Sequence, residues 1–232
     1  MESRTFGGKV FSLWAAAIFF ALLFLFAAAD FLSWYSFSRY QAERKASRSI
    51  EAGFPQMEGA LQRAVRFSKN PVYYKELTRL YLERAMAEND FGTPAARDAA
   101  LVRAEASARQ WIRQNPVDAW AYYELGKIYL LYNFPLLTYA EKGRLYLKKA
   151  VELKPADEFL NQNVLYIFMT QWERLKESER EFVAVQWRSM TESFPNFERK
   201  LRGRWQNNLI SSNDLDLILK FGVAPRHLIH FK

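Results

Sequence analysis

The feature that most constrains this chain is an uncharged run near its start. Residues 10–29 read VFSLWAAAIFFALLFLFAAA, and Ser12 is the one polar side chain among them. A helix rises about 1.5 Å per residue, so twenty residues span about 30 Å, the thickness of the hydrocarbon core of a bilayer. A surface helix of a soluble domain would need a polar face, which this run lacks. The run therefore predicts a transmembrane helix.

The segments around this run have the order of a secretory signal peptide. Residues 1–9 carry Arg4 and Lys9, and three alanines at 27–29 stand directly before Asp30. An alanine-rich end after an apolar run is typical of a cleavage site. The run is long for a signal peptide, however, and almost no polar segment precedes the alanines. We therefore predict an uncleaved signal anchor over 10–29, after a tail over 1–9 and before a helical stalk over 30–54.

The signals for membrane orientation conflict. The short basic tail favours an N-terminus on the inner side, which would place the rest of the chain outside. Four cations follow the run within about twenty residues and count against export: Arg39, Arg44, Lys45 and Arg48. We expect residues 39–48 to lie near lipid headgroups. Because a signal-like N-terminus is a route into the translocon, we predict a single-pass inner (cytoplasmic) membrane protein with its module on the exported (periplasmic) side.

Composition narrows the function classes. The 232 residues include 33 Lys plus Arg, 25 Asp plus Glu and no Cys, for a formal charge of +8. The lack of Cys excludes disulfides, thiolate metal sites and a Cys nucleophile. The basic surplus is spread through segments of mixed sign, so we expect no nucleic acid partner. Nine glycines, eight prolines and no strand-like alternation predict an all-α fold.

Prolines recur along the chain at a nearly fixed period. Pro71, Pro116, Pro155 and Pro195 are separated by 45, 39 and 40 residues. A period of this size is typical of arrays of helix pairs. The predicted helices cover residues 55–68, 71–88, 95–114, 117–132, 136–153, 157–175, 179–193 and 196–208, with a short helix over 214–221. Thr93 and Ser178 are predicted N-caps.

Residues 116–155 resemble one unit of the tetratricopeptide repeat family. The aromatic-x-x-Leu-Gly-x-x-Tyr spacing of that family is met by Tyr122, Leu125, Gly126 and Tyr129. The resemblance is weaker over 71–115 and poor over 156–195. It implies a right-handed α-solenoid of antiparallel helix pairs over 55–208, followed by a short helix and tail over 209–232. Independently of the family, Gly126 would let two crossing helices approach closely.

The resemblance also implies a concave groove that binds a partner. The groove residues expected from it are Trp120, Tyr123, Lys127, Leu130 and Leu131 of one unit and Lys75, Thr78 and Leu82 of the preceding one. Aromatic and aliphatic side chains supply contact area for a peptide, and a lysine selects acidic groups. We therefore expect protein partners, membrane or envelope proteins in particular, with the bilayer itself contacted by residues 10–29.

The sequence holds no catalytic motif that we can identify. His227 and His230 are three residues apart, but no HExxH pattern or thiolate surrounds them, so we predict no metal site, no cofactor and no enzyme activity. The leading hypothesis is a non-enzymatic, membrane-anchored scaffold or assembly subunit. The alternative is an accessory subunit of envelope polysaccharide synthesis or export that binds glycan or a glycosyl-transferring enzyme. The anchor could also pack into a larger membrane complex through Ala15, Ala16 and Ala17.

Overall fold

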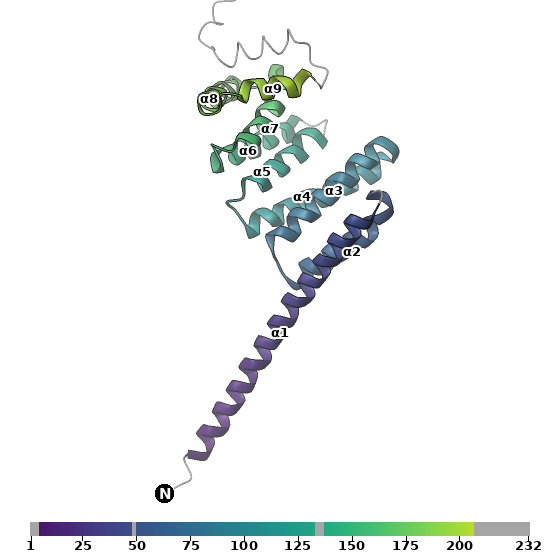
Figure 1. Cartoon of the computed structure of the whole chain (residues 1–232), viewed down its shortest axis with the longest axis vertical. Helices are drawn as coiled ribbons and strands as arrows, with labels where there is room; N and C mark the ends of the chain where they lie inside the picture. The colour runs from purple at the N-terminus through teal and green to yellow at the C-terminus, as the bar shows by residue number, and fades with distance from the viewer. Residues whose placement is uncertain (1–4, 48–49, 133–136, 207–232) are drawn as a thin grey trace, which may run out of the picture. The chain divides into compact units, whose positions relative to one another are not determined.

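The computed structural model describes residues 5–47, 50–132 and 137–206 (Figure 1). Every element in these ranges is helical and none is a strand, which confirms the all-helical prediction. The α-helices are α1 (Thr5–Ala46), α2 (Ile50–Phe67), α3 (Pro71–Phe91), α4 (Pro94–Gln114), α5 (Ala119–Lys127), α6 (Leu137–Leu153), α7 (Glu158–Met169), α8 (Glu177–Ser193) and α9 (Phe197–Gln206). A π-helix, η1 (Ile128–Tyr132), continues α5, and a 3-10 turn, η2 (Trp172–Arg174), follows α7. The predicted short helix at 214–221 and both histidines lie outside the described residues.

The chain forms two compact units, residues 1–115 and 116–232, which are described separately. In unit 1, α2 packs on α1 and on α3, and α3 packs extensively on α4. In unit 2, α5 packs on α6, and α7 packs on α5, α6, α8 and α9. The single repeat domain expected over 55–208 stays a prediction.

Side-chain caps explain where several helices begin. Asn70 accepts a hydrogen bond from the backbone N–H of Val72 at 2.9 Å, and Pro71 opens α3. Thr93 caps α4 in the same way, which confirms its prediction. The predicted cap at Ser178 is wrong, because α8 already begins at Glu177 and its capping carboxylate is that of Glu179, which accepts from the backbone N–H of Lys176 at 2.9 Å.

Two predicted helices end earlier than the sequence pattern indicates. The stretch from 10 to 52 contains no Gly or Pro, yet α1 ends at Ala46 and α2 begins at Ile50. Gly53 lies so close to Ser47 that a Cβ there would overlap the serine hydroxyl, so this close approach requires glycine. The helix predicted over 157–175 ends at Met169, where the Thr170 hydroxyl donates to the carbonyl of Ile167 at 2.8 Å.

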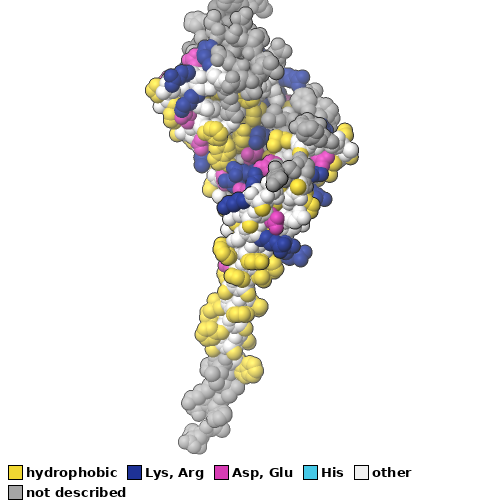
Figure 2. Space-filling view, turned by 45° about the vertical axis from the view of Figure 1, so that its right-hand side comes forward, with side chains coloured by type: hydrophobic (Ala, Val, Ile, Leu, Met, Phe, Trp, Pro, Cys, Tyr) yellow, Lys and Arg dark blue, Asp and Glu magenta, His cyan; other side chains and the backbone are white. Residues whose placement is uncertain are grey.

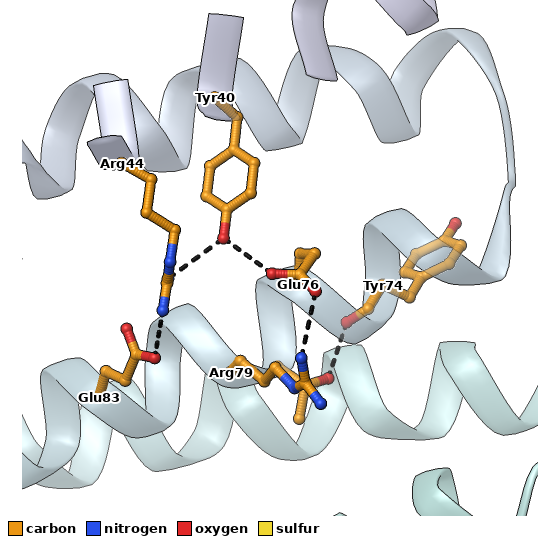
Figure 3. A network of polar contacts seen from close by, with 7 residues as sticks. Tyr40, Arg44, Tyr74, Glu76, Arg79 and Glu83 are labelled. Atoms are coloured by element: carbon orange, nitrogen blue, oxygen red, sulfur yellow. Dashed lines mark hydrogen bonds and ion pairs between the residues drawn. The ribbon is translucent and has the colours of Figure 1, made fainter. Parts of the chain in front are cut away.

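The second half of α1 is bound firmly to the rest of unit 1. Ser33 is buried and its hydroxyl donates to the carbonyl of Ala64 at 3.2 Å. The hydroxyl of Tyr40, also buried, donates to Glu76 Oε2 at 2.9 Å and accepts from Arg44 at 3.2 Å (Figure 3). Residues 33–46 of the predicted stalk therefore belong to the packed unit, and the helix that reaches the apolar run is joined to α2 and α3 without a hinge between them.

The apolar part of α1, over residues 14–32, is largely exposed. Within the described part of the chain, one helix is long and apolar enough to cross a membrane, Trp14–Ala46, and its most apolar window is 0% buried. The helix could equally serve as a signal sequence on these criteria. Its exposed large apolar side chains include Trp14, Phe19, Phe20, Leu22, Phe24, Leu25, Phe26 and Phe31. In water such a surface would be unstable, so the structure requires a nonaqueous environment or a partner for it.

Helix positions at regular offsets before each proline of the repeat are mostly buried. Ala104, Ala108 and Trp111 are buried in unit 1, and Leu147, Ala150, Val183, Trp187 and Met190 are buried in unit 2. Phe67 is the exception, because its side chain is 39% exposed. At the crossing of α5 and α6, a Cβ on Gly126 would lie 2.7 Å from Leu147 Cδ2 and 3.0 Å from the Gly143 carbonyl. The predicted close approach at Gly126 is confirmed.

Candidate partner-binding surface

The eight predicted groove residues fall in both units. Lys75, Thr78 and Leu82 lie on α3 of unit 1. Trp120, Tyr123 and Lys127 lie on α5 of unit 2, and Leu130 and Leu131 lie on η1. Since the two units are separate bodies, each set is considered within its own unit.

The set on α3 offers a partner little surface. Thr78 and Leu82 are buried, and the Thr78 hydroxyl donates to the carbonyl of Tyr74 at 2.8 Å. Lys75 is half-buried, with its Nζ 5.8 Å from the ring centroid of Trp111. Because α3 packs on both α2 and α4, more than one of its faces is buried. Thr78 and Leu82 therefore pack inside the fold, where the prediction placed them in a groove.

Two residues of the second set are also core residues. Tyr123 and Leu130 belong to the buried hydrophobic cluster of unit 2. The side chain of Leu131 lies outside the described residues. The predicted straight helix over 117–132 changes at Ile128 into a π-helix, and a wider turn redirects the side chains that follow. This change accounts for Leu130 pointing into the core.

The remaining residues, Trp120 and Lys127, form a partly exposed cluster with Phe159 around the buried ring of Tyr123, and we call Trp120, Lys127 and Phe159 the aromatic surface. The Trp120 ring is 5.3 Å from the Tyr123 ring, edge-on, and 5.8 Å from the ring of Phe159 on α7. Phe159 is 61% exposed and Trp120 is half-buried. Lys127 Nζ lies 4.9 Å from the Tyr123 ring centroid and 2.7 Å from Glu124 Oε2. The surface thus combines flat rings with one partly neutralised cation.

Phe159 was not predicted, although the sequence carries a signal for it. Trp120 lies four residues after Pro116 and two after its cap, Asp118. Phe159 has the same spacing from Pro155 and from Asp157, whose side chain accepts from the backbone N–H of Leu160 at 2.9 Å. Aligning the two segments that begin at Pro116 and Pro155 would therefore have placed both aromatics at equivalent positions.

Unit 1 has a hollow of about 380 Å³ that we considered as a second site. Its lining residues are Phe54, Pro55, Tyr81, Arg84, Glu88, Ala96, Ala99, Ala100 and Arg103. Both guanidinium groups are already engaged, because Arg84 pairs with Glu88 and Arg103 pairs with Glu58 at 2.8 Å. Burial raises the pKa of the Tyr81 hydroxyl, which stays protonated and donates to Glu58 Oε1 at 2.8 Å. These groups hold α2, α3 and α4 together, and few of their hydrogen-bond donors or acceptors are left to bind a ligand.

Neither unit contains a metal site within its described residues. No group of three or more His, Cys, Asp or Glu side chains is placed to bind an ion in that part of the chain. Among the described surfaces, the aromatic surface brings together the half-buried ring of Trp120 and the exposed ring of Phe159, and aromatic side chains are enriched at protein interfaces.

Comparison with known proteins found no relative of this chain. No protein-family model matches it, and neither the curated proteins nor the solved structures returned a match. The resemblance to the tetratricopeptide repeat family therefore depends on the residues of 116–155 alone. Of these, Leu125, Gly126 and Tyr129 are buried, and the Tyr122 hydroxyl donates to the carbonyl of Pro116 at 3.1 Å.

Proposed function

We propose that this protein is a non-enzymatic, single-span membrane scaffold that holds a partner protein on its helical module. The observation that carries the proposal is the direct connection between the exposed apolar part of α1 and the packed helices of unit 1. Ser33 and Tyr40 are buried against α2 and α3 within the same helix that carries the apolar run. Unit 1, fixed to its anchor in this way, would be held at a set height above the membrane.

We further propose that the module is a right-handed solenoid of antiparallel helix pairs similar to tetratricopeptide repeats. Support comes from the pairing of α3 with α4 and of α5 with α6, and from the spacing that Trp120 and Phe159 share. The close crossing of α5 and α6 at Gly126 and Gly143 is also consistent with that packing.

The proposed partner site is the aromatic surface of unit 2. The exposed ring of Phe159 and the half-buried ring of Trp120 would cover an apolar side chain of the partner. Lys127 would favour a partner segment with a carboxylate nearby, although Glu124 competes for the same ammonium group. A membrane or envelope protein with an exposed segment of this kind fits both the site and the anchor.

Truncating the two aromatic rings is expected to abolish partner binding. The variant Trp120→Ala/Phe159→Ala should lower affinity by at least about thirtyfold per ring, which corresponds to the roughly 2 kcal/mol of a hot-spot side chain. Co-purification of crosslinked complexes from mild detergent, quantified by mass spectrometry, measures the loss. The matched control is Val185→Ala, an exposed apolar position on α8 of the same unit. Unchanged partner recovery in the double variant would count against the site.

We propose that α1 crosses the inner membrane and that the module lies on its exported side. Support comes from the signal-like order of the N-terminal segments, whereas Arg39, Arg44, Lys45 and Arg48 favour the opposite orientation.

Thiol labelling tests this orientation. The chain has no native Cys, so an introduced thiol is the one thiol that a maleimide can label. A thiol at the exposed position 102, made by Val102→Cys, is expected to react with a membrane-impermeant maleimide in intact cells. Reaction only after permeabilisation would place the module in the cytoplasm.

A further inference from the structure

The turn between α2 and α3 is the part of the packed helices nearest to the anchor. Gly53 near the start of α2 touches Ser47, and Ala64 near its end bonds to Ser33, so α2 leads back along α1 toward the apolar run. The ring of Tyr73 lies 4.9 Å from that of Phe37, and Glu76 meets Tyr40, so α3 leads away again. Residues 65–72 therefore form the membrane-facing end of unit 1.

The height of this end follows from the rise of α1. At about 1.5 Å per residue, Ser33 lies about 6 Å beyond Ala29, the last residue of the apolar run. The headgroup layer on each side of a bilayer is also about 6 Å thick. Ala64 is level with Ser33, and Phe67 and Lys69 continue from it toward the anchor. The turn therefore falls within the headgroup layer if α1 spans the bilayer.

The side chains at this turn have the composition of a membrane-contacting surface. Between Gly59 and Lys75 the sequence contains no Asp or Glu. Arg63, Arg66 and Lys69 are exposed there, and within the described residues none of them forms an ion pair with a carboxylate. Phe67 and Val72 are exposed apolar side chains beside these cations. We call Arg63, Arg66, Phe67, Lys69 and Val72 the basic corner.

By the same geometry, part of residues 39–48, which were expected to lie near lipid headgroups, is too far from the bilayer to reach them. Arg44 lies about 22 Å beyond Ala29 along α1, well above a headgroup layer about 6 Å thick. Its guanidinium bonds to Glu83 at 2.6 Å instead (Figure 3). Figure 2 shows Lys and Arg side chains beside the hydrophobic ones where the exposed apolar part of α1 joins the rest of unit 1.

We propose that the basic corner is a second membrane contact, which binds the headgroups of anionic phospholipids while Phe67 and Val72 enter the interface. This inference assumes the proposed membrane span of α1. Each Lys or Arg held at an anionic surface contributes about 1 kcal/mol, or about fivefold in local lipid preference. Aromatic and aliphatic side chains next to cations add apolar burial at the same depth. The contact would fix the tilt and rotation of unit 1 on the bilayer.

The test uses full-length protein in nanodiscs with a fluorophore at position 72, attached to the single thiol that Val72→Cys introduces. Two sets of nanodiscs each contain the same small fraction of a quencher lipid, which carries a nitroxide at a shallow acyl position. The quencher lipid is phosphatidylglycerol in one set and phosphatidylcholine in the other. We expect several-fold stronger quenching by the phosphatidylglycerol, and equal quenching by both lipids in the variant Arg63→Glu/Arg66→Glu/Lys69→Glu. A fluorophore at the exposed position 102 of α4 is the control and should be quenched by neither lipid.

The outcomes separate this inference from the proposed anchor. Equal quenching by both lipids in the unaltered corner would overturn selection of anionic headgroups. No quenching at position 72, in protein that resists extraction from membranes by alkaline carbonate, would overturn the contact while leaving the anchor intact. Release of the protein by carbonate would overturn the membrane span itself and the inference with it.

Discussion

Replacing Glu179 by alanine is expected to destabilise unit 2 by about 3–5 kcal/mol, because it leaves a buried arginine without its counter-charge. Arg144 Nε on α6 lies 2.7 Å from Glu179 Oε1 on α8, and the two side chains are only 6% and 10% exposed. The second carboxylate oxygen accepts from the backbone N–H of Lys176 at 2.9 Å. The substitution therefore removes a charge pair and the capping carboxylate of α8 together.

Hydrogen exchange of peptides from α6 and α8, measured on the full-length protein in detergent, reports this loss locally. The control variant is Glu198→Ala, which breaks the exposed pair with Arg202 on α9 and should cost less than about 1 kcal/mol. The double variant Arg144→Met/Glu179→Leu should recover much of the stability, since no unpaired charge remains buried. Similar protection in Glu179→Ala and Glu198→Ala would show that the buried pair has no special role.

The variant Gly126→Val is expected to destabilise unit 2 by about 3 kcal/mol, the upper end of the usual range for an overpacked core. A Cβ at Gly126 already approaches Leu147, and it lies 3.0 Å from the carbonyl of Gly143, which cannot move without shifting α6. The reverse contact is similar, because a Cβ on Gly143 would lie 2.6 Å from Leu130 Cγ and 3.0 Å from the carbonyl of Gly126. Valine would force the two helices apart at their closest point.

A matched glycine exists in the same unit. A Cβ at Gly203 on α9 would have no heavy atom within 4 Å, so Gly203→Val should be neutral or slightly stabilising through better helix propensity. The two variants are compared by thermal unfolding of the full-length protein, followed by tryptophan fluorescence. Equal midpoints for Gly126→Val and Gly203→Val would mean that α5 and α6 do not cross as closely as described.

Local features of the sequence were sufficient to predict much of the fold. The apolar run, the cap at Thr93, and the helix positions of Trp111 and Trp187 all depend on neighbours in the same helix. Hydrophobic period and capping chemistry are short-range signals, so a single sequence reveals them. The end of α1 was not predictable in this way, because the chain there has no Gly or Pro, and the boundary depends on α2 packing back along α1, where Ser33 bonds to Ala64.

The candidate site depends on side-chain direction, which the sequence specifies less well. Thr78 and Leu130 were placed in a groove by the resemblance to tetratricopeptide repeats, but the second packed face of α3 and the π-turn at Ile128 bury them. One residue of slip turns a helical side chain by about 100°. Trp120 is still partly exposed, because it lies close to its cap at Asp118, before such a change in side-chain direction can build up. Phe159 has the same spacing from its own cap, Asp157, and could have been predicted in the same way.

The central claim is that the aromatic surface holds a protein partner at the membrane. It is tested most directly by placing a photo-crosslinking amino acid at position 159 of the full-length protein in native membranes, with position 185 as the control. The account predicts a discrete protein adduct at 159 that disappears when Trp120→Ala is introduced, and no adduct at 185. Absence of an adduct at 159, or the same adducts at both positions, would contradict it.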